Sequence, residues 1–537
     1  MIASWIFRLT ALSAGILSLQ VSAATITVTS TADSGPGSLR AALTAANNGD
    51  TVDATGVSGA IQLESGQLVV STSVTILGPG PGTLTVEGQS GARVFDVSPG
   101  LNVTISGMTI DGGDPTGSFP ANSGGGILND LATLTVSNCV IGPNGATFGG
   151  GIYNYGEDGT ASLMLINSTL SNNHSVSNNQ GWGAGIYNDS EDNGNATVTI
   201  SNCTLTSNTN NSYGGGVYND GYGGTANLTI GYSTISNNAA GYQPFDSEGG
   251  AICNFSEEGR ATVTINSSTL QSNEATFGGA IYNDALDSGS ASINVTNSTF
   301  GFNQADSGGG AIFNYAEFAG ASISLNLCTF NGNYATNNGT CIANEDGQSA
   351  SALVTIGNSI VSGDQTNANL YNSIGTFTSE GYNLCSDSGS GLLNAAGDQT
   401  NTDPMLGPLQ NNGGPTLTYA LLPGSPAINA GNPAFTPPPD YDQRGPGYPR
   451  LVNGRLDIGA VEQQVAPPML GILETTSPNV VLYWPQSYSN FTLQTASALT
   501  TASWTLVTNT PVAGPGGQLY VTNNASGPSQ FFRLISQ

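Results

Sequence analysis

Short runs of alternating apolar and polar residues dominate this chain. From residue 124 to about residue 364 these runs recur with a period of about 30 residues. Each unit contains a Gly-Gly-small-Ile-aromatic-Asn string (149–154), an alternating run (196–200) and an Asn-Ser-Thr-Leu-x-x-Asn segment (167–173), as these examples from different units show. Period-two alternation bounded by Asn, Gly and Ser predicts three short β-strands in each unit.

Three strands of this length cannot bury an apolar face alone, so successive units must stack on one another. The sequence therefore predicts an all-β fold, a right-handed parallel β-helix of about eight coils spaced ~4.8 Å apart. An asparagine recurs at a fixed phase, and we expect it to form an amide ladder between coils. The members of this row are Asn129, Asn154, Asn188, Asn219, Asn254, Asn283, Asn314 and Asn344.

Cysteine usage fits the same ladder principle. Cys139, Cys203 and Cys328 share a phase that other units fill with serine, namely Ser168, Ser233 and Ser298. At least one unit separates these cysteines from each other, which places their sulfurs too far apart to bridge. Cys341 and Cys385 remain open, because their positions allow either a disulfide or two free thiols.

The flanking segments predict a domain order. Residues 1–24 resemble an export signal, with cleavage after Ala23 or Ala24. Residues 25–123 are expected to form an N-terminal cap and irregular first coils, 124–402 the repeats, and 403–465 a C-terminal cap. A linker at 466–468 precedes a small antiparallel β-domain over 469–537, which we expect to be a sandwich. The N-terminal cap should contain a short helix that begins near Ser38 and buries one face, formed by Leu39, Ala42, Leu43 and Ala46.

Charge narrows the function classes. The formal net charge is −28, only 8% of the residues are charged, and all eight basic residues are arginines. Nucleic-acid binding needs clustered Lys and Arg, so this composition argues against it. After the leader, no stretch is long and apolar enough to span a bilayer. These features favour a protein that is secreted or displayed on a cell surface.

Two resemblances agree with that location. The strings Gly279-Ala280-Ile281 and Phe300-Gly301-Phe302-Asn303 resemble the repeats of polymorphic outer-membrane proteins, which implies a right-handed parallel β-helix used in adhesion. Residues 403–462 resemble the terminal module of the choice-of-anchor Q family, through strings such as 412–416 (Asn-Gly-Gly-Pro-Thr), 424–431 (Gly-Ser-Pro-Ala-Ile-Asn-Ala-Gly), 442–445 (Asp-Gln-Arg-Gly) and 457–460 (Asp-Ile-Gly-Ala). That resemblance implies a bacterial surface or secreted β-helix protein. Charged residues of this module, Asp442, Arg444, Arg450, Asp457 and Glu462, are interpreted as ion pairs that pin the cap rather than as a catalytic set.

Enzymatic chemistry finds little support in the repeats. A polysaccharide lyase needs a basic residue beside carboxylates, and Arg260 is the only cation within the repeats. The lone histidine, His174, lies in a polar loop without a serine or aspartate constellation around it. No catalytic residue is predicted, although paired carboxylates that hydrolyse a glycosidic bond remain an alternative.

Acidic residues follow the recurrent asparagine at matching offsets. Stacked coils should align them into a stripe, whose mutual repulsion would favour Ca²⁺ as a possible bound ion. The alternative is a solvated face that keeps the rod soluble. The stripe comprises Glu157, Asp158, Asp189, Glu191, Asp192, Asp220, Glu257, Glu258, Asp284, Asp287 and Glu317.

Aromatic residues occupy the position between Ile and Asn in many units. If the Ile side chains point inward, alternation should turn the rings outward, as a platform for sugar rings; ring-to-ring stacking for stability is the alternative. The row consists of Tyr153, Tyr187, Tyr218, Tyr282 and Phe313. We therefore predict a binding or adhesion protein that contacts a polysaccharide or a cell surface through one face. A carbohydrate-active β-helix enzyme (lyase or hydrolase) and a purely structural surface element remain alternatives.

Overall fold

The computed structural model describes residues 23–536, apart from 176–180, 242–246, 365–366, 453, 465–468, 475–478, 487–488, 490, 498–503 and 525–529. The predicted export signal lies almost entirely outside the described residues, and the predicted linker at 466–468 does so completely. Two compact units are present, one ending at Gln463 and one beginning at Gln464.

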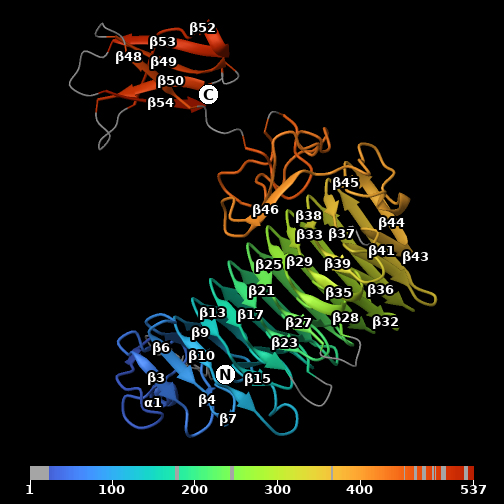
Figure 1. Ribbon diagram of the computed structural model, residues 1–537. Coiled ribbons are helices and arrows are strands. Elements are labelled where there is room, and N and C mark those ends of the chain that lie inside the picture. The colour runs from blue at the N-terminus through green and yellow to red at the C-terminus, as the bar shows by residue number, and fades with distance from the viewer. Residues whose placement is uncertain are drawn as a thin grey trace, which may run out of the picture. The chain divides into compact units, whose positions relative to one another are not determined.

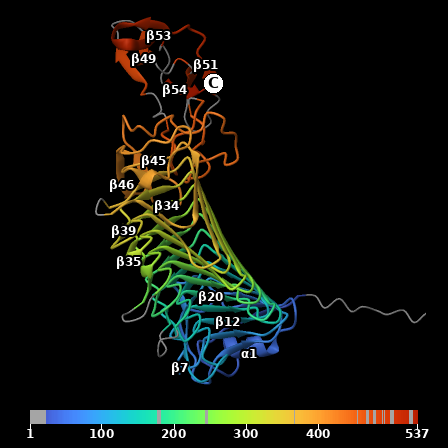
Figure 2. The same ribbon diagram turned by 90° about the vertical axis from the view of Figure 1, so that its right-hand side faces the viewer.

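The first unit is a parallel β-helix (Figures 1 and 2). Sheet 1 has 13 strands from β1 (Thr25–Thr27) to β44 (Thr376–Gly381), and sheet 2 has 12 strands from β3 (Gly59–Gln62) to β45 (Leu384–Cys385). Sheet 3 has 11 strands. In chain order these are β4 (Leu68–Val70), β8 (Phe95–Val97), β12 (Ile127–Asp130), β16 (Ile152–Tyr155), β20 (Ile186–Asp189), β24 (Val217–Asp220), β28 (Ile252–Glu257), β32 (Ile281–Leu286), β36 (Ile312–Glu317), β40 (Ile342–Asp346) and β43 (Leu370–Ser373).

The predicted fold class is confirmed, with one addition. Besides the three expected strands, most repeat coils carry a short fourth strand, and these form a seven-stranded sheet 4 from β15 (Gly145–Ala146) to β39 (Tyr334–Ala335). Within the repeat region, the strands of sheet 3 from β12 to β40 give the eight expected coils. Further coils precede and follow them, so the regular geometry extends beyond the segment in which the sequence repeat can be recognised.

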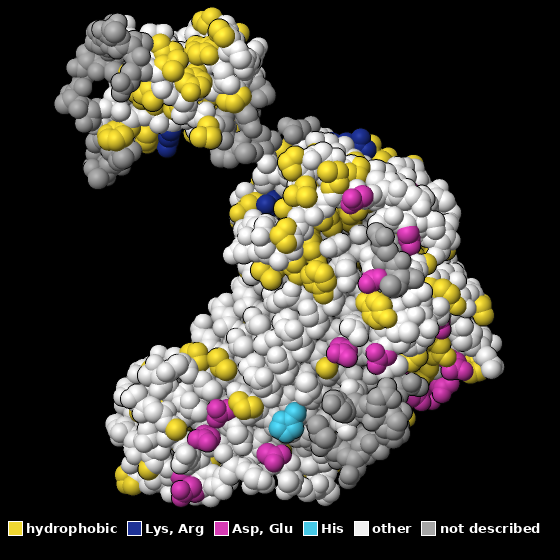
Figure 3. All heavy atoms as spheres, viewed as in Figure 1, with side chains coloured by type: hydrophobic (Ala, Val, Ile, Leu, Met, Phe, Trp, Pro, Cys, Tyr) yellow, Lys and Arg dark blue, Asp and Glu magenta, His cyan; other side chains and the backbone are white. Residues whose placement is uncertain are grey.

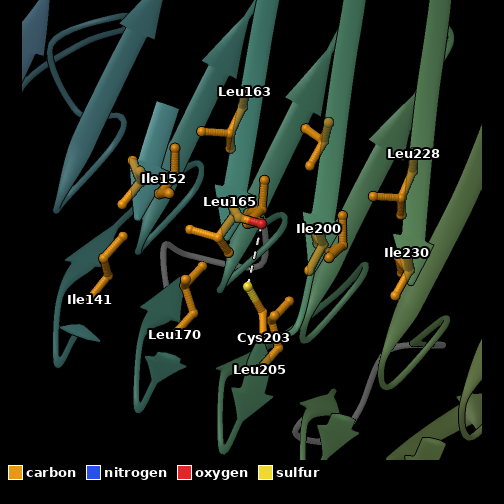
Figure 4. Close-up of a cluster of buried hydrophobic side chains, with 14 of the residues drawn as sticks. Ile141, Ile152, Leu163, Leu165, Leu170, Ile200, Cys203, Leu205, Leu228 and Ile230 are labelled. Atoms are coloured by element: carbon orange, nitrogen blue, oxygen red, sulfur yellow. Dashed lines mark hydrogen bonds between the residues drawn. The ribbon is translucent and has the colours of Figure 1, made fainter. Parts of the chain in front are cut away.

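One apolar core runs along the inside of the coils. Residues such as Ile152, Leu163, Leu165 and Leu170 point inward from one coil onto their counterparts in the next, and all four are buried (Figure 4). Because successive side chains of a strand alternate between faces, the inward apolar residues explain the period-two pattern in the sequence.

Polar ladders join the coils at their corners. The predicted asparagine row is fully buried, and each Nδ2 donates to the Oδ1 of the next coil at 2.6–2.8 Å, from Asn129 to Asn372. A second asparagine ladder runs from Asn144 to Asn333 at 2.9–3.1 Å. The expected Ser/Cys ladder is also present, since the backbone N–H of Cys203 donates to Ser233 Oγ at 3.1 Å. All six cysteines are free and buried, Cys341 and Cys385 included.

The N-terminal end is closed as predicted. Helix α1 spans Leu39–Ala45, Ser38 Oγ accepts a hydrogen bond from the N–H of Ala41 at 3.2 Å, and Leu39, Ala42, Leu43 and Ala46 are buried. A serine oxygen at this position satisfies one of the backbone donors that a helix leaves free at its first turn.

The segment 403–462, predicted as a C-terminal cap, contacts the solenoid from the side. Leu393, which precedes this segment, belongs to the buried core. The segment lies along the outer face of sheet 2, where Gln443 Nε2 donates to Thr269 Oγ1 at 2.8 Å and Ala460 N donates to Thr329 Oγ1 at 2.9 Å. These threonines are buried by it, whereas their counterparts in earlier coils remain half-exposed.

The charged residues of this segment contact one another and the segment's backbone, and Asp442 and Arg444 form one of the expected ion pairs. Arg444 pairs with Asp442 at 2.5 Å, and the Asp457 and Glu462 carboxylates accept backbone N–H groups, for example from Asn429 at 2.6 Å and Asp457 at 2.8 Å. Arg450 is fully buried beside them, and desolvation raises the pKa of Glu462 to about 8. Their contacts are therefore made within the segment itself.

The second unit is a two-sheet antiparallel β-domain. One sheet has the order β48 (Gly471–Glu474), β49 (Asn479–Pro485), β53 (Gln518–Asn524), β52 (Val512–Gly514); the other is β51 (Thr505–Leu506), β50 (Phe491–Ala496), β54 (Phe531–Ser536). Trp484, Leu493 and Val521 are among the buried residues between them. The expected sandwich-like domain is confirmed.

Candidate ligand groove beside sheet 3

The predicted ring row points away from the main core, as alternation requires, but it is not exposed. Each ring is 6% exposed or less. Rings of neighbouring coils contact one another, with centroid distances of 5.0 Å for the stacked pair Tyr153–Tyr187, 5.2 Å for the tilted pair Tyr187–Tyr218 and 5.5 Å for the stacked pair Tyr282–Phe313. The expectation that Tyr153, Tyr187, Tyr218, Tyr282 and Phe313 form an open platform is therefore wrong, and the stacking alternative describes them.

A second aromatic row covers the first. Phe148, Trp182, Tyr213 and Phe277 occupy equivalent positions in successive bridges between coils, and all four are partly exposed. Ring contacts such as Trp182–Tyr187 at 6.1 Å and Phe277–Phe313 at 5.1 Å join the two rows. Sequence reasoning missed this outer row. Its signal is an aromatic residue directly before the first glycine of the string in four of the repeat units.

The acidic stripe divides into three tiers. Asp189, Asp220 and Asp284 are buried on sheet 3 strands, whereas Glu157, Glu191, Glu257 and Glu317 are half-buried. The exposed tier consists of turn residues with positive φ, namely Asp158 (54°), Asp192 (50°), Glu258 (56°) and Asp287 (40°). Because Asp, unlike most residues, tolerates this left-handed conformation, turn geometry explains part of the predicted stripe.

The buried tier interacts with the inner rings. Tyr153 Oη donates to Asp189 Oδ2, and one coil on Tyr187 Oη donates to Asp220 Oδ2 at 2.9 Å. The second oxygen of each carboxylate accepts a backbone N–H two residues later, from Glu191 and Tyr222, at 3.0 Å. Desolvation raises the pKa of Asp189 to about 6 and holds that of Asp220 well above its usual range.

One set of carboxylates has metal-like spacing. Oxygens of Asp189, Glu191 and Asp220 lie within 4.8 Å of one another, and burial together with the nearby Asp189 raises the pKa of Glu191 to about 7. Carboxylate oxygens are the ligands that Ca²⁺ prefers. Among the described residues, this is the only group that meets that geometric criterion, so the structure does not bring the whole predicted stripe together as one metal site.

Both aromatic rows are interrupted in a single coil, the one that contains β28. Cys253 lies in register between Tyr218 and Tyr282, and Glu248 lies between Tyr213 and Phe277. Two small or acidic side chains thus replace two rings. A hollow of about 550 Å³ opens there, which we call the β28 hollow. Its lining includes Trp182, Tyr213, Tyr218, Asp220, Glu248 and Asp284.

A smaller hollow lies beside the β28 hollow. Phe148, Trp182, Tyr187, Asp189 and Glu191 line a neighbouring space of about 270 Å³, so Trp182 and Glu191 belong to both. In Figure 3 acidic and apolar side chains lie together on the edge of the solenoid near β28 and β32. We call these two adjacent spaces together the groove beside sheet 3, and the volume of the larger is typical of small-ligand sites.

The comparisons with known proteins add no family. No protein-family model matches the chain, and the search of curated proteins finds no match. Within the part of the chain that the structure describes, no helix is long and apolar enough to cross a membrane.

Proposed function

We propose that this chain is a secreted or cell-surface β-helix protein that binds a polysaccharide in the groove beside sheet 3. The observation that carries the proposal is the β28 hollow, where Trp182, Tyr213 and Tyr218 line the same space as several carboxylates. Aromatic faces pack against the apolar faces of sugar rings, and adjacent carboxylates accept hydrogen bonds from hydroxyl groups. The export-like leader and the resemblance of residues 403–462 to choice-of-anchor Q modules support the location and a bacterial surface role.

Binding is favoured over catalysis by the state of the carboxylates. Hydrolysis of a glycosidic bond needs an acid and a base that are free to exchange protons with the substrate. Asp189 and Asp220 instead hold a tyrosine hydroxyl and a backbone N–H each. Their contacts stabilise the coil. The alternative of a carbohydrate-active enzyme keeps one supporting observation, which is the pKa of about 7 that burial gives Glu191 within the groove.

A polysaccharide panel separates the functions. The full chain is incubated with neutral, acidic and amino polysaccharides, and both retention and product release are measured. Retention without cleavage is the expected result. New reducing ends or unsaturated products would show an enzyme, and a protein that retains no glycan would leave the structural role. Trp182→Ala should abolish retention, whereas Trp504→Ala, in the second unit, provides an aromatic control outside the groove.

We also propose that Asp189, Glu191 and Asp220 bind Ca²⁺, and a separate experiment tests this site. Binding of an ion to the folded state alone raises the unfolding midpoint. The midpoint should therefore be higher in Ca²⁺ than in EDTA, and Glu191→Gln should remove the difference. An identical midpoint in both buffers would contradict the calcium site.

A further inference from the structure

The geometry of one coil points to the chemical class of the ligand. We propose that the β28 hollow binds a protonated amino group, and that the polysaccharide it serves is an amino-sugar polymer with free amines. This inference rests on the proposed function, since it identifies which polysaccharide enters the same groove.

The first argument is a carboxylate without its usual partner. In two earlier coils the inner-row tyrosine donates its hydroxyl to the aspartate one coil further on, as Tyr153 does to Asp189 and Tyr187 to Asp220. The same step from the β28 coil leads from Cys253 to Asp284, and cysteine carries no such hydroxyl. Asp284 is 5% exposed, and its Oδ1 has no hydrogen-bond partner.

The second argument is the charge of the lining. Asp220, Glu248 and Asp284 face the hollow together with Glu191 and Glu257, and no arginine occurs among the described residues that line it. Asp220 and Asp284 are buried, and a buried carboxylate without a compensating cation is costly to ionise. Burial accordingly raises the pKa of Asp284 to about 7. A bound ammonium group would restore the ionised form and supply three donors for these oxygens.

The third argument is the rings. Trp182, Tyr213, Tyr218 and Phe255 surround the same space. A cation within about 6 Å of an aromatic centroid is attracted by the ring, most strongly by tryptophan. Aromatic faces beside carboxylates therefore suit a ligand that has both an ammonium group and flat apolar faces. A hexosamine with a free amine has both, whereas a neutral hexose lacks the charge.

Titration calorimetry with the full chain tests the inference. Three hexasaccharides with the same β-1,4 linkage serve as probes: glucosamine, N-acetylglucosamine and glucose, at a mildly acidic pH where the amine is protonated. We expect the glucosamine hexamer to bind at least about tenfold more tightly than the others, because a hydrogen bond to a charged group contributes about 1.5–3 kcal/mol. Asp284→Asn and Glu248→Gln should each remove most of this preference. Glu64→Gln, an exposed glutamate in an early coil, is the matched control and should leave it unchanged.

The outcomes distinguish the two proposals. Equal affinity for all three hexamers would overturn the amino-sugar inference and keep the polysaccharide function. Absence of binding to every glycan would overturn both. Binding of pentalysine but not of the glucosamine hexamer would reject the sugar in favour of a basic peptide. Cys253→Tyr gives a further check, because a ring at this position should fill the hollow and abolish binding; unchanged binding would place the site elsewhere.

Discussion

Replacing Asn219 by alanine removes one amide from the middle of the first asparagine ladder. Its Nδ2 donates to Asn254 Oδ1 at 2.8 Å, and its Oδ1 accepts from Asn188 Nδ2 at 2.7 Å. Among the described contacts, Asn254 Oδ1 has no other donor, so the substitution leaves a buried oxygen unsatisfied. Asn188 Nδ2 keeps the carbonyl of Ala196 at 3.2 Å.

The expected loss follows from these two effects. Leaving the buried Asn254 Oδ1 without a donor costs about 1–3 kcal/mol, and losing the hydrogen bond from Asn188 costs about 1 kcal/mol. Asn219→Ala should therefore lower the free energy of unfolding by about 3 kcal/mol. Asn372→Ala is the control at the end of the ladder. There Asn344 Nδ2 loses one acceptor but still donates to Ala352 O at 3.1 Å, and no asparagine oxygen of the ladder loses its donor. Its expected loss is about 1 kcal/mol.

Urea unfolding followed by circular dichroism measures both variants, with native-state hydrogen exchange to locate the opening. Coils contact only their neighbours, so local unfolding is expected, and hydrogen exchange should show lost protection on both sides of β24. Equal losses for the two variants, or a loss at Asn219 below that at Asn372, would refute the view that ladder continuity stabilises the coils.

Three further predictions concern other parts of the solenoid. Ser38→Ala should cost about 1 kcal/mol and speed exchange in Leu39–Ala45, since it removes the helix cap; unchanged exchange would contradict the cap. Burial raises the pKa of Asp284 from 3.8 and that of Glu191 from 4.5, both to about 7, so the folded state binds more protons than the unfolded state. Stability should therefore fall as pH rises from about 4 to about 7. The melting midpoint of Asp284→Asn should depend less on pH over this range, and an unchanged pH dependence would contradict the prediction. Reductant should leave the melting midpoint unchanged, because all six cysteines are free; a lowered midpoint would reveal a disulfide.

The regular parts of the fold can be predicted from the sequence because each ladder repeats one residue type at the same position of every unit. The inward Ile and Leu positions, the asparagine row and the Ser/Cys row all follow from stacking identical units. The helix at Ser38 was equally predictable, since its cap and its apolar face are local signals. In contrast, the place of residues 403–462 depends on contacts between positions far apart in sequence, such as Thr269 and Leu417, and no periodic pattern encodes them.

Only part of the candidate site can be predicted from the sequence. Alternation correctly directs the Tyr153 row away from the core, but whether a row is covered depends on the next layer. That layer comes from Phe148, Trp182 and Tyr213, which lie in isolated bridges rather than in alternating strands. The spacing from the recurrent asparagine likewise cannot separate buried carboxylates from turn residues with positive φ, because both kinds of acidic residue follow the same asparagine.

The β28 hollow lies in the coil where both aromatic rows are interrupted, so we expect this coil to be less stable than its neighbours but able to bind a ligand. Cys253→Tyr should complete the inner row, with a ring between Tyr218 and Tyr282 and a hydroxyl near Asp284. Aromatic pairs contribute about 0.5–1.5 kcal/mol and a bond to a carboxylate about 1.5–3 kcal/mol, so a gain of about 2 kcal/mol in urea unfolding is expected. Cys203→Tyr is the contrasting control, because Cys203 packs inside the main core, where overpacking should cost about 1–3 kcal/mol or more. A loss of stability in Cys253→Tyr similar to that in Cys203→Tyr would show that the β28 coil has no vacant rung. A gain in stability together with lost binding would show that this coil departs from the repeat in order to hold a ligand.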